Sequence, residues 1–544
     1  MRDRRSSATW LPPGVELPSD NDYNRGVKGQ SVARIAGRMG IATLASRVLG
    51  VVREQIFAAL FGASVFSDAF ITAFRIPNLL RDLFAEGALS AAFVPTFSGT
   101  LTKEGGQAAF RLANLVLSTL TLLIGLLVLA AMIFPQPIVE TIAPGFHGQK
   151  LELTVLATRI MLPFLLLVSL AAVCMGMLNS HDRYTTAAFA PAMFNAGTIA
   201  TGIVLRLAGC SDRAAVIGWS IGTLIGGAAQ LGIQLVPLWR LGFRFRPRLD
   251  LAFRDPGMRR MAGLMGFAVI GLAATQVNLF VSTIFASTDE RAISYLNYAF
   301  RVLYLPIGLF GVAAGTITAV RSGRAAAVND AEELAASVRD SLRFLILFTI
   351  PAAAGLVVLG RPIVRLLFER GRFGPEDTEA TAAALALYGI GLLAYSSVKV
   401  FASAFYSLSK PYIPVICSFA AVGANVLFAS LTFSTLGFRG LALGTSLGAL
   451  VNCGLLAAVF HVQNGLFRRD LLMLLGKVTL ASAVMAAAAA VISAQVESRF
   501  PVHSLATTLL AAGVPIACGL GIFVAACRLL GIAELPSLSS FRRR

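Results

Sequence analysis

The chain has 544 residues, of which 56% are hydrophobic and only 14% are charged. Soluble domains carry about 25% charged residues, so this composition excludes an ordinary soluble domain. The net charge of +18 does not indicate nucleic-acid binding, because the basic residues gather in connecting segments and tails, as they do in membrane proteins. We therefore expect an all-α polytopic membrane protein with no nucleic-acid partner.

The two ends of the chain are polar. Residues 1–33 contain no apolar core of the signal-peptide type, and we expect them to form a flexible cytoplasmic tail. Residues 531–544 end in FRRR and are expected to form a basic cytoplasmic tail. The six cysteines are scattered without a CxxC pair, which indicates neither a zinc site nor a disulfide framework.

Apolar stretches long enough to cross ~30 Å of hydrocarbon recur from about residue 34 to residue 530. They predict fourteen transmembrane helices, centred at about residues 47, 84, 122, 166, 197, 225, 273, 307, 350, 391, 424, 450, 483 and 517. An even number places both termini on one side, and the basic residues near both ends favour the cytoplasmic side. The arginine-rich loop 239–260 falls on that side, whereas the basic segment 361–377 falls outside and is the exception.

Short identities recur along the chain at one common spacing. AFR at 73–75 returns at 299–301, and GWSIG at 218–222 returns, at the same spacing, as GTSLG at 444–448. Six helices per copy is an even number, so both copies have the same orientation, as in transporters built from parallel repeats. We predict an N-lobe over residues 34–259, a C-lobe over 260–470, and two appended helices over 471–530.

Ionisable residues concentrate in the first two predicted helices. The first contains Arg47, Arg53 and Glu54, and the second contains Asp68, Arg75, Arg81, Asp82 and Glu86. Spacings of seven, seven and four residues place Asp68, Arg75, Asp82 and Glu86 roughly on one helical face, which Asn78 joins. Charged groups at membrane depth cost a few kcal/mol or more each, and they normally face a protein interior or a wet cavity.

Two interpretations of these charges remain open. In the first, four arginines and four acids form a structural ion-pair network between the two helices. In the second, they line a polar cavity whose arginines bind an anionic substrate, because guanidinium forms paired hydrogen bonds with phosphate. Arg301, the repeat partner of Arg75, would complete a cationic ring. For Arg301 and Lys399, snorkelling to an interface is the alternative.

The stretches SRVLGVVREQIFAALFGAS (46–64) and SDAFITAFRIPNLLRDLFAEGALSAAFVPTF (67–97) resemble the MurJ/MviN family of lipid II flippases, of the multidrug/oligosaccharidyl-lipid/polysaccharide exporter superfamily. Similar stretches are APGF (143–146), NSHDRYTTAAFAPAMFN (179–195), STIFAS (282–287), LFERGRF (367–373) and VKVFASAFYSLSKPYIP (398–414). The resemblance covers about residues 34–530. It implies fourteen helices in two six-helix lobes plus two, in the bacterial cytoplasmic membrane.

The resemblance also implies a function and a site. The family moves lipid II, the undecaprenyl-pyrophosphate-linked disaccharide-pentapeptide, from the inner to the outer leaflet by alternating access. The substrate-binding residues that the resemblance implies are Arg47, Arg53, Asp68, Arg81, Glu86 and Arg301, to which the charge pattern adds Arg75 and Asn78. The helices over 471–530 would form a groove for the lipid tail. We expect no catalytic residue and no cofactor, a monomer, and contacts with cell-wall synthesis and division proteins.

The chain departs from the family pattern at several positions. Asp82 stands where a second basic residue often follows Arg81, and Phe300 and Tyr304 stand where acids often accompany the arginine of helix eight. Some members bind sodium through an acid whose position matches Ser282, and Asn425 and Thr445 would be weak remnants of that site. No other metal site is expected. Coupling to membrane potential, protons or sodium stays open.

Two other functions are alternatives. An exporter of drugs or of another lipid-linked oligosaccharide belongs to the same superfamily, and the helix-two stretch argues against it. A membrane-embedded glycosyl- or phosphotransferase would need catalytic acids, bases or metal ligands grouped near an interface. The four histidines are far apart, and the chain contains no HExxH, Walker loop or DxxD pair in a loop. We therefore expect a transporter rather than an enzyme.

Overall fold

The computed structural model describes residues 29–81, 89–248, 255–466, 468–499 and 504–532. Throughout these residues the secondary structure is helical, as expected. The first half comprises α2 (Gly29–Phe61), α3 (Val65–Arg81), α4 (Ser90–Glu104), α5 (Gly106–Ile133), α6 (Pro135–Ile142), α7 (Gly148–Met161), α8 (Pro163–Ser180), α9 (Tyr184–Leu207) and α10 (Asp212–Arg240).

The second half begins with a long helix and ends with an antiparallel pair. It comprises α11 (Pro256–Ser287), α12 (Ala292–Pro306), the π-helical turn η2 (Ile307–Gly311), α13 (Val312–Ala327), α14 (Ala331–Val358), α15 (Gly360–Phe368), α16 (Pro375–Gly389), α17 (Leu392–Ser407), α18 (Tyr412–Leu436) and α19 (Phe438–Asn464). The last two helices are α20 (Arg469–Arg499) and α21 (Leu505–Leu529).

Membrane-spanning character follows from length and apolarity. Among the described residues ten helices are long and apolar enough to cross a membrane, or up to eleven if the bent pair α16–α17 is one span. The continuous pairs α7–α8 and α12–α13 each count once in that number. The charged helix α2, the pair α3 and α4, and α11 occupy the remaining positions, so the structure is consistent with the predicted fourteen.

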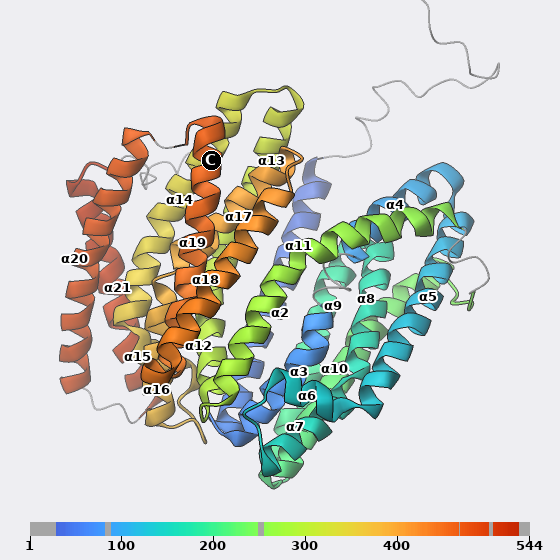
Figure 1. Cartoon of the computed structure of the whole chain (residues 1–544), viewed down its shortest axis with the longest axis horizontal. Helices are drawn as coiled ribbons and strands as arrows, with labels where there is room; N and C mark the ends of the chain where they lie inside the picture. Colours follow the sequence, from blue (N-terminus) through green and yellow to red (C-terminus); the bar gives the residue numbers. More distant parts are fainter. Residues whose placement is uncertain (1–28, 82–88, 249–254, 467, 500–503, 533–544) are drawn as a thin grey trace, which may run out of the picture.

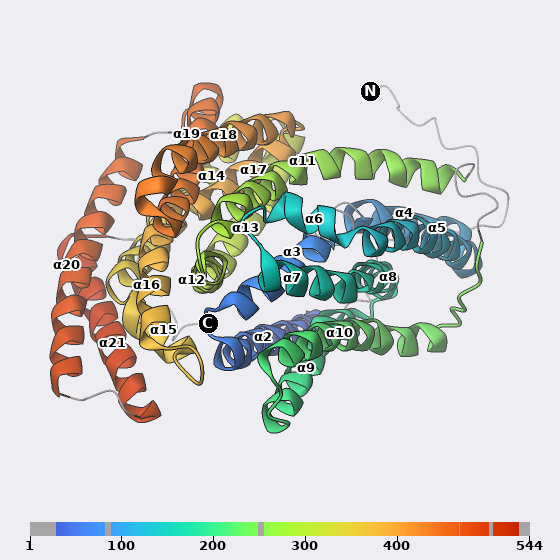
Figure 2. The ribbon, with the colours of Figure 1, turned by 60° about the horizontal axis from the view of Figure 1, so that its bottom comes forward.

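The helices form two bundles side by side (Figure 1). Helices α2–α10 make one bundle, α12–α19 make the other, and Figure 2 shows the same separation from a second direction. Helix α11 joins them, because it packs against α4 in the first bundle and α18 in the second. Helices α20 and α21 lie at the outer edge of the second bundle, where α20 packs against α14 and α21 against α15.

The helix positions show the predicted internal repeat. Each of three long helices in the first lobe has a counterpart in the second lobe at nearly the spacing of the two AFR stretches: α2 has α11, α5 has α14, and α10 has α19. The short helices repeat as well, since α6 begins at Pro135 and α15 at Gly360. Six-helix units in the same orientation are therefore the building plan of this chain.

We call the end of the molecule where α2 begins the upper end and the end where α2 stops the lower end, as they lie in Figure 1. Two backbone approaches close the lobes together at the lower end. The Gly145 amide donates to Ser287 Oγ at 3.0 Å, and the Arg372 amide donates to the Ala59 carbonyl at 3.0 Å. Gly145 and Gly371 are separated by the spacing of the repeat. These are therefore repeat-related contacts, each made with the end of the other lobe's first helix.

Only glycine fits at these two approaches. A Cβ at Gly145 would lie 2.5 Å from the Ser287 carbonyl oxygen, and one at Gly371 would collide with the Ala59 carbonyl. Gly371 also has φ +61°, a conformation that other residues rarely adopt. We call the contacts of Gly145 with Ser287 and of Gly371 and Arg372 with Ala59 the lower seal.

Aromatic rings fill the interior just above the lower seal. Phe57 of α2 packs against Phe61, Phe70 and Trp219, with ring centroids 4.9, 5.1 and 5.4 Å apart. Tyr298 of α12 lies 6.4 Å from Phe57 and carries the cluster into the second lobe. These buried rings form a solid floor between the lobes.

The basic segment 361–377 lies at the lower end, opposite the start of α2, as the even helix count requires. Acids match its arginines: Arg361 pairs with Glu379 at 3.3 Å, Arg365 pairs with Glu369 at 3.4 Å and Glu497 at 3.2 Å, and Arg372 pairs with Asp212. Because of these pairs the segment carries less uncompensated positive charge than its arginines suggest, which accounts for its exception to the charge rule.

Candidate functional site

A cavity of about 620 Å³ lies between the two lobes, above the aromatic floor. Helices α2, α3, α9 and α10 of the first lobe line one side. Helices α11, α12, α16, α17 and α19 line the other. A cavity in this position can bind a ligand that both lobes contact at once.

The cavity is strongly cationic. Its lining includes five basic side chains, Arg53, Arg75, Arg81, Arg301 and Lys399, whereas Glu54 is the one acidic side chain among the described lining residues. Charges of one sign that converge in a partly dry space attract an oppositely charged ligand more strongly than they would in water. The arrangement is suited to an anion with more than one negative charge.

Glu54 joins the arginines of the two lobes. Its Oε1 accepts from Arg53 Nη2 at 2.5 Å and lies 3.6 Å from Nε of Arg301 on α12. The Arg53 guanidinium also lies over the Phe194 ring, 5.4 Å from the centroid. The side chain of Arg301 is 48% exposed, so its guanidinium faces the open space of the cavity. One carboxylate therefore compensates two arginines only in part.

Two further arginines line the cavity from α3. Arg75 donates a hydrogen bond through Nη1 to Thr283 Oγ1 on α11 and so reaches across to the second half of the chain. Arg81 lines the cavity from the last turn of α3, and Asn78 lies between them. The even spacing of these three residues, with two residues between each and the next, places them on one helical face.

The wall formed by the second lobe is rich in aromatic rings. Phe300 contacts Tyr388 edge-on with centroids 5.6 Å apart, and Tyr304 and Tyr395 each lie 6.4 Å from Phe300. The 46° bend between α16 and α17 places Tyr388 and Tyr395 on either side of it, both against the cavity. Aromatic side chains of this kind offer a flat apolar face and, in tyrosine, a polar hydroxyl.

The predicted site residues divide into three groups. Arg53, Arg75, Asn78, Arg81 and Arg301 line the cavity. Arg47 lies beside Gly308 of η2, where a Cβ would approach its Nη1 to 3.3 Å, and is not in the lining. Asp68 is fully buried at the lower end, and Glu86 falls outside the described residues.

The position of Asp68 separates it from the cavity. Its Oδ2 accepts from Lys150 Nζ at 2.7 Å, and its Oδ1 accepts from the Ser294 amide at 2.9 Å and the Ser294 hydroxyl at 2.5 Å. These partners belong to α7 in the first lobe and α12 in the second. In this conformation Asp68 therefore connects the lobes rather than lining the cavity, although it shares a helical face with Arg75.

The three positions that match the family's sodium site lie on α11, α18 and α19. Ser282 and Thr445 line the cavity. Asn425 is buried and its amide donates to Asn278 Oδ1 at 2.6 Å. Within the described part of the chain no group of three or more histidine, cysteine, aspartate or glutamate side chains could hold a metal ion.

Several lining residues are absent from the predicted site. Glu54 and Lys399 are visible in the sequence as intramembrane charges, and the adjacency of Glu54 to Arg53 is the available signal for a shared site. The aromatic wall has no such signal, because aromatic residues are common in apolar helices whether or not they line a cavity. Asn278 and Asn297 also line the cavity from the second lobe.

Comparison with known sequences identifies the family. Residues 57–511 match the model of the family described as "Lipid II flippase MurJ". A "probable lipid II flippase MurJ" of Rhizobium meliloti is 38% identical over 529 residues, which cover 94% of this chain and 96% of that protein. The "lipid II flippase MurJ" of Burkholderia cenocepacia is 33% identical over 421 residues, which cover 76% of this chain and 81% of that protein.

Solved structures share the fold. A lipid II flippase MurJ in an inward closed conformation aligns with a TM-score of 0.74 at 24% identity, covering 90% of this chain and 98% of that one. An inward-facing multidrug resistance transporter of the MATE family aligns with a TM-score of 0.65 at 15% identity, covering 78% and 97%. Together with the sequence matches, the cationic cavity and the parallel repeat, these findings show that the chain belongs to the MurJ family of lipid II flippases.

Proposed function

We propose that this protein moves lipid II from the inner to the outer leaflet of the bacterial cytoplasmic membrane by alternating access. The observation that carries the proposal is the cationic cavity between two repeat-related lobes. A diphosphate bearing a sugar-peptide head needs a wet, positively charged compartment to cross, because burying charged and polar groups in hydrocarbon without partners is costly.

The arginines hold the diphosphate. Guanidinium groups form paired hydrogen bonds with phosphate oxygens and stay charged at every physiological pH. Arg53 and Arg301 lie on opposite lobes and share Glu54, so a diphosphate between them replaces a carboxylate as their counter-ion. Binding of the head therefore adds contacts to both lobes at once.

The aromatic wall receives the sugars. The rings of Phe300, Tyr388 and Tyr395 face the cavity from the second lobe, opposite the arginines of α2 and α3. Sugar rings present apolar C–H faces and hydroxyl edges, which match a flat ring with a hydroxyl at its tip. The head thus lies with its diphosphate toward the first lobe and its sugars toward the second.

The upper end faces the cytoplasm in this proposal, with both termini there. The lower seal and the aromatic floor then close the outer side, and the cavity serves the inner leaflet. Transport requires the lobes to separate at the lower end while they close above. The apolar helices α20 and α21 run along the second lobe, and the lipid tail stays in the bilayer beside them.

The direction of transport needs an energy source. Moving one charge across the membrane potential changes the free energy by ~2.3 kcal/mol per 100 mV, so the negative head makes a potential inside negative a sufficient driving force. A flipping assay in vesicles, run with an imposed potential, a sodium gradient or a proton gradient, identifies which of the three accelerates transport.

The test of the proposed function uses purified protein in vesicles and measures lipid II that becomes accessible at the far leaflet. Arg53→Ala and Arg301→Ala should each abolish most transport, while Arg206→Ala, an exposed arginine at the end of α9, should leave it unchanged. Correct folding of each variant is verified by its thermal unfolding. Wild-type transport in both cavity variants would rule out the cationic site.

A further inference from the structure

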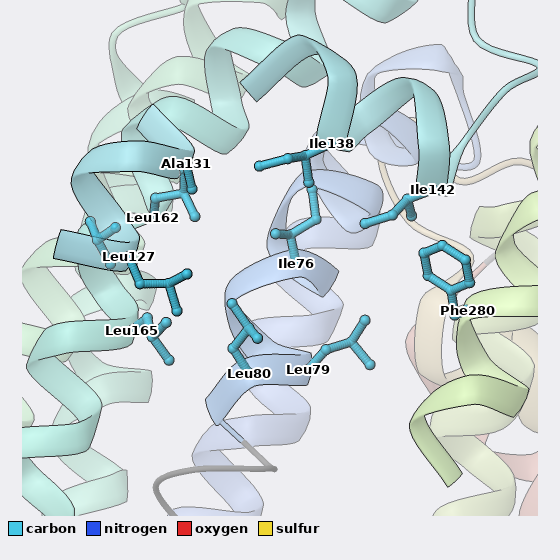
Figure 3. A pocket seen from close by; sticks show the side chains of 11 residues that line it. Ile76, Leu79, Leu80, Leu127, Ala131, Ile138, Ile142, Leu162, Leu165 and Phe280 are labelled. Atoms are coloured by element: carbon cyan, nitrogen blue, oxygen red, sulfur yellow. The ribbon is translucent and has the colours of Figure 1, made fainter. Parts of the chain in front are cut away.

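A second cavity lies on the far side of α3 from the cationic one. Its volume is about 250 Å³, and its lining side chains are all apolar. Figure 3 shows them converging on one space: Ile76 and Leu80 of α3, Leu127 of α5, Ile138 of α6, Leu165 of α8 and Phe280 of α11. We call this space the apolar crevice.

The two cavities share two helices as walls. On α3, Asn78 lines the cationic cavity and its neighbour Leu79 lines the apolar crevice. On α11, Leu279 lines the cationic cavity and its neighbour Phe280 lines the crevice. The seam between α3 and α11 therefore separates a charged compartment from an apolar one by the thickness of a helix.

Arg75 crosses this seam. Its guanidinium lines the cationic cavity and donates a hydrogen bond to Thr283 of α11. A diphosphate that binds Arg75 competes with the Thr283 hydroxyl for the same donor, because charge-assisted hydrogen bonds to phosphate are stronger than those to a neutral hydroxyl. Binding of the head would thus release a contact that ties α3 to α11.

The crevice lies toward the lower end of the molecule. Its lining includes Val128 and Ala131 in the last turns of α5 and Ile142 at the end of α6, which precedes the lower seal. With the upper end at the cytoplasm, this level belongs to the outer half of the membrane.

We propose that the apolar crevice binds a segment of the isoprenoid tail of lipid II after its head has entered the cavity, with the tail passing between α3 and α11. The inference rests on the proposed function, and it places a tail site in the first lobe, away from α20 and α21. The occupant follows from the geometry: a molecule that joins a diphosphate to a long branched hydrocarbon needs a cationic and an apolar compartment side by side.

The crevice orients the tail more than it adds affinity. Lipid chains are as apolar as leucine side chains, so a tail that enters gains packing contacts but little hydrophobic energy. A bulk phospholipid acyl chain has the same apolar chemistry but carries no diphosphate that binds Arg75. The experiment therefore has to distinguish the tail of lipid II from bulk lipid.

Photocrosslinking tests the site directly. The photoreactive residue p-benzoylphenylalanine replaces Phe280 in the crevice, Phe300 in the cationic cavity, or Phe419, a 46% exposed residue of α18. Each full-length variant is placed in vesicles with radiolabelled lipid II and irradiated. Mild acid then cleaves the allylic diphosphate linkage, which shows whether the protein has captured the head or the tail.

The expected result is capture of the tail at position 280, capture of the head at position 300, and several-fold weaker labelling at position 419. Capture at 300 together with labelling at 280 no stronger than at 419, or with bulk phospholipid alone at 280, would overturn the tail site and leave the proposed function intact. A lack of capture at 300 in a protein that transports nothing would overturn both.

A filling substitution provides an independent measurement. Ala131→Phe places a ring in the crevice, whereas Ala130→Phe makes the same change at the neighbouring residue, which is exposed and outside the crevice. Ala131→Phe should lower lipid II transport and tail capture at position 280 several-fold, and Ala130→Phe should alter neither. Equal transport by both variants, with equal thermal unfolding, would contradict the site.

Discussion

The Asp68 carboxylate accepts two hydrogen bonds from Ser294, which lies 226 residues further along the chain. This separation equals the spacing of the internal repeat, so the two residues occupy equivalent positions in the two lobes and meet each other at the lower end. Lys150 completes the site with an ion pair at 2.7 Å. A buried carboxylate with donors from both lobes makes their contact at this end depend on one side chain.

Replacing Asp68 with asparagine should weaken this contact. The Asp68→Asn side chain can still accept from Ser294, but it leaves the Lys150 ammonium without its counter-ion in a site that is closed to water. Breaking a buried ion pair by removing one partner is strongly unfavourable, so the conformation that exposes Lys150 gains. We expect the population open at the lower end to rise about tenfold, or ~1.4 kcal/mol.

The measurement for Asp68→Asn is the labelling rate of a cysteine at position 63 by a membrane-impermeant thiol reagent. Ala63 is 4% exposed, and the six native cysteines are first replaced by alanine. Glu152→Gln, at an exposed position of α7, is the control and should leave the rate unchanged. Identical rates in all three proteins would show that Asp68 does not hold the lobes together.

Gly145→Ala tests the lower seal by steric means alone. The new methyl group would lie 2.5 Å from the Ser287 carbonyl oxygen, so the α6–α7 connection must move away from the end of α11. Spin labels on the exposed residues Gln149 and Glu290 should report a longer and broader distance between the lobes. Gly99→Ala, where no atom lies within 4 Å, should keep the native distance, and an unchanged distance in both variants would argue against the seal.

Neutralising Glu54 should strengthen anion binding and slow transport. Glu54→Gln removes the carboxylate that compensates Arg53 and Arg301, so a diphosphate no longer competes with it. We expect about tenfold tighter binding of undecaprenyl diphosphate, or ~1.4 kcal/mol, together with slower release at the far side. Equilibrium binding and vesicle transport measure the two effects, with Glu104→Gln on α4 as the control, and weaker binding in Glu54→Gln would refute the expectation.

Arg339 should contribute more to stability than the exposed arginines near it. Its side chain is 6% exposed and donates to Glu332 at 2.7 Å, whereas Arg321 is 37% exposed in its pairs with Glu333 and Asp340. Exposed ion pairs contribute ~0–1 kcal/mol, while loss of a buried hydrogen-bonded group costs ~1–3 kcal/mol. Thermal unfolding in detergent should show a clear loss for Arg339→Ala and a small one for Arg321→Ala, and the reverse order would contradict this assignment.

Much of the architecture was readable from the residues alone. Apolar length predicted the helices, and short identities at one spacing predicted the repeat that the helix boundaries show. The intramembrane arginines marked α2 and α3 as lining a cavity, because charged groups in a membrane need water or partners. The aromatic wall was not predictable, since Phe300 and Tyr395 satisfy the same apolar pattern whether they face lipid or a cavity.

Asp68 shows where spacing stops being sufficient. Seven residues place it on the same helical face as Arg75, but they also separate the two side chains by ~10 Å along the axis. That distance takes Arg75 to the level of the cavity and leaves Asp68 at the level where the lobes touch.

The sequence by itself determined the spans, the duplication and the family, because these follow from local apolarity and from patterns that need no partner. Only the tertiary structure decided which charges face the cavity, which join the lobes, and that an apolar crevice lies behind α3. Those outcomes depend on the height and rotation of each helix relative to the opposite lobe, which are set by packing between residues far apart in the chain.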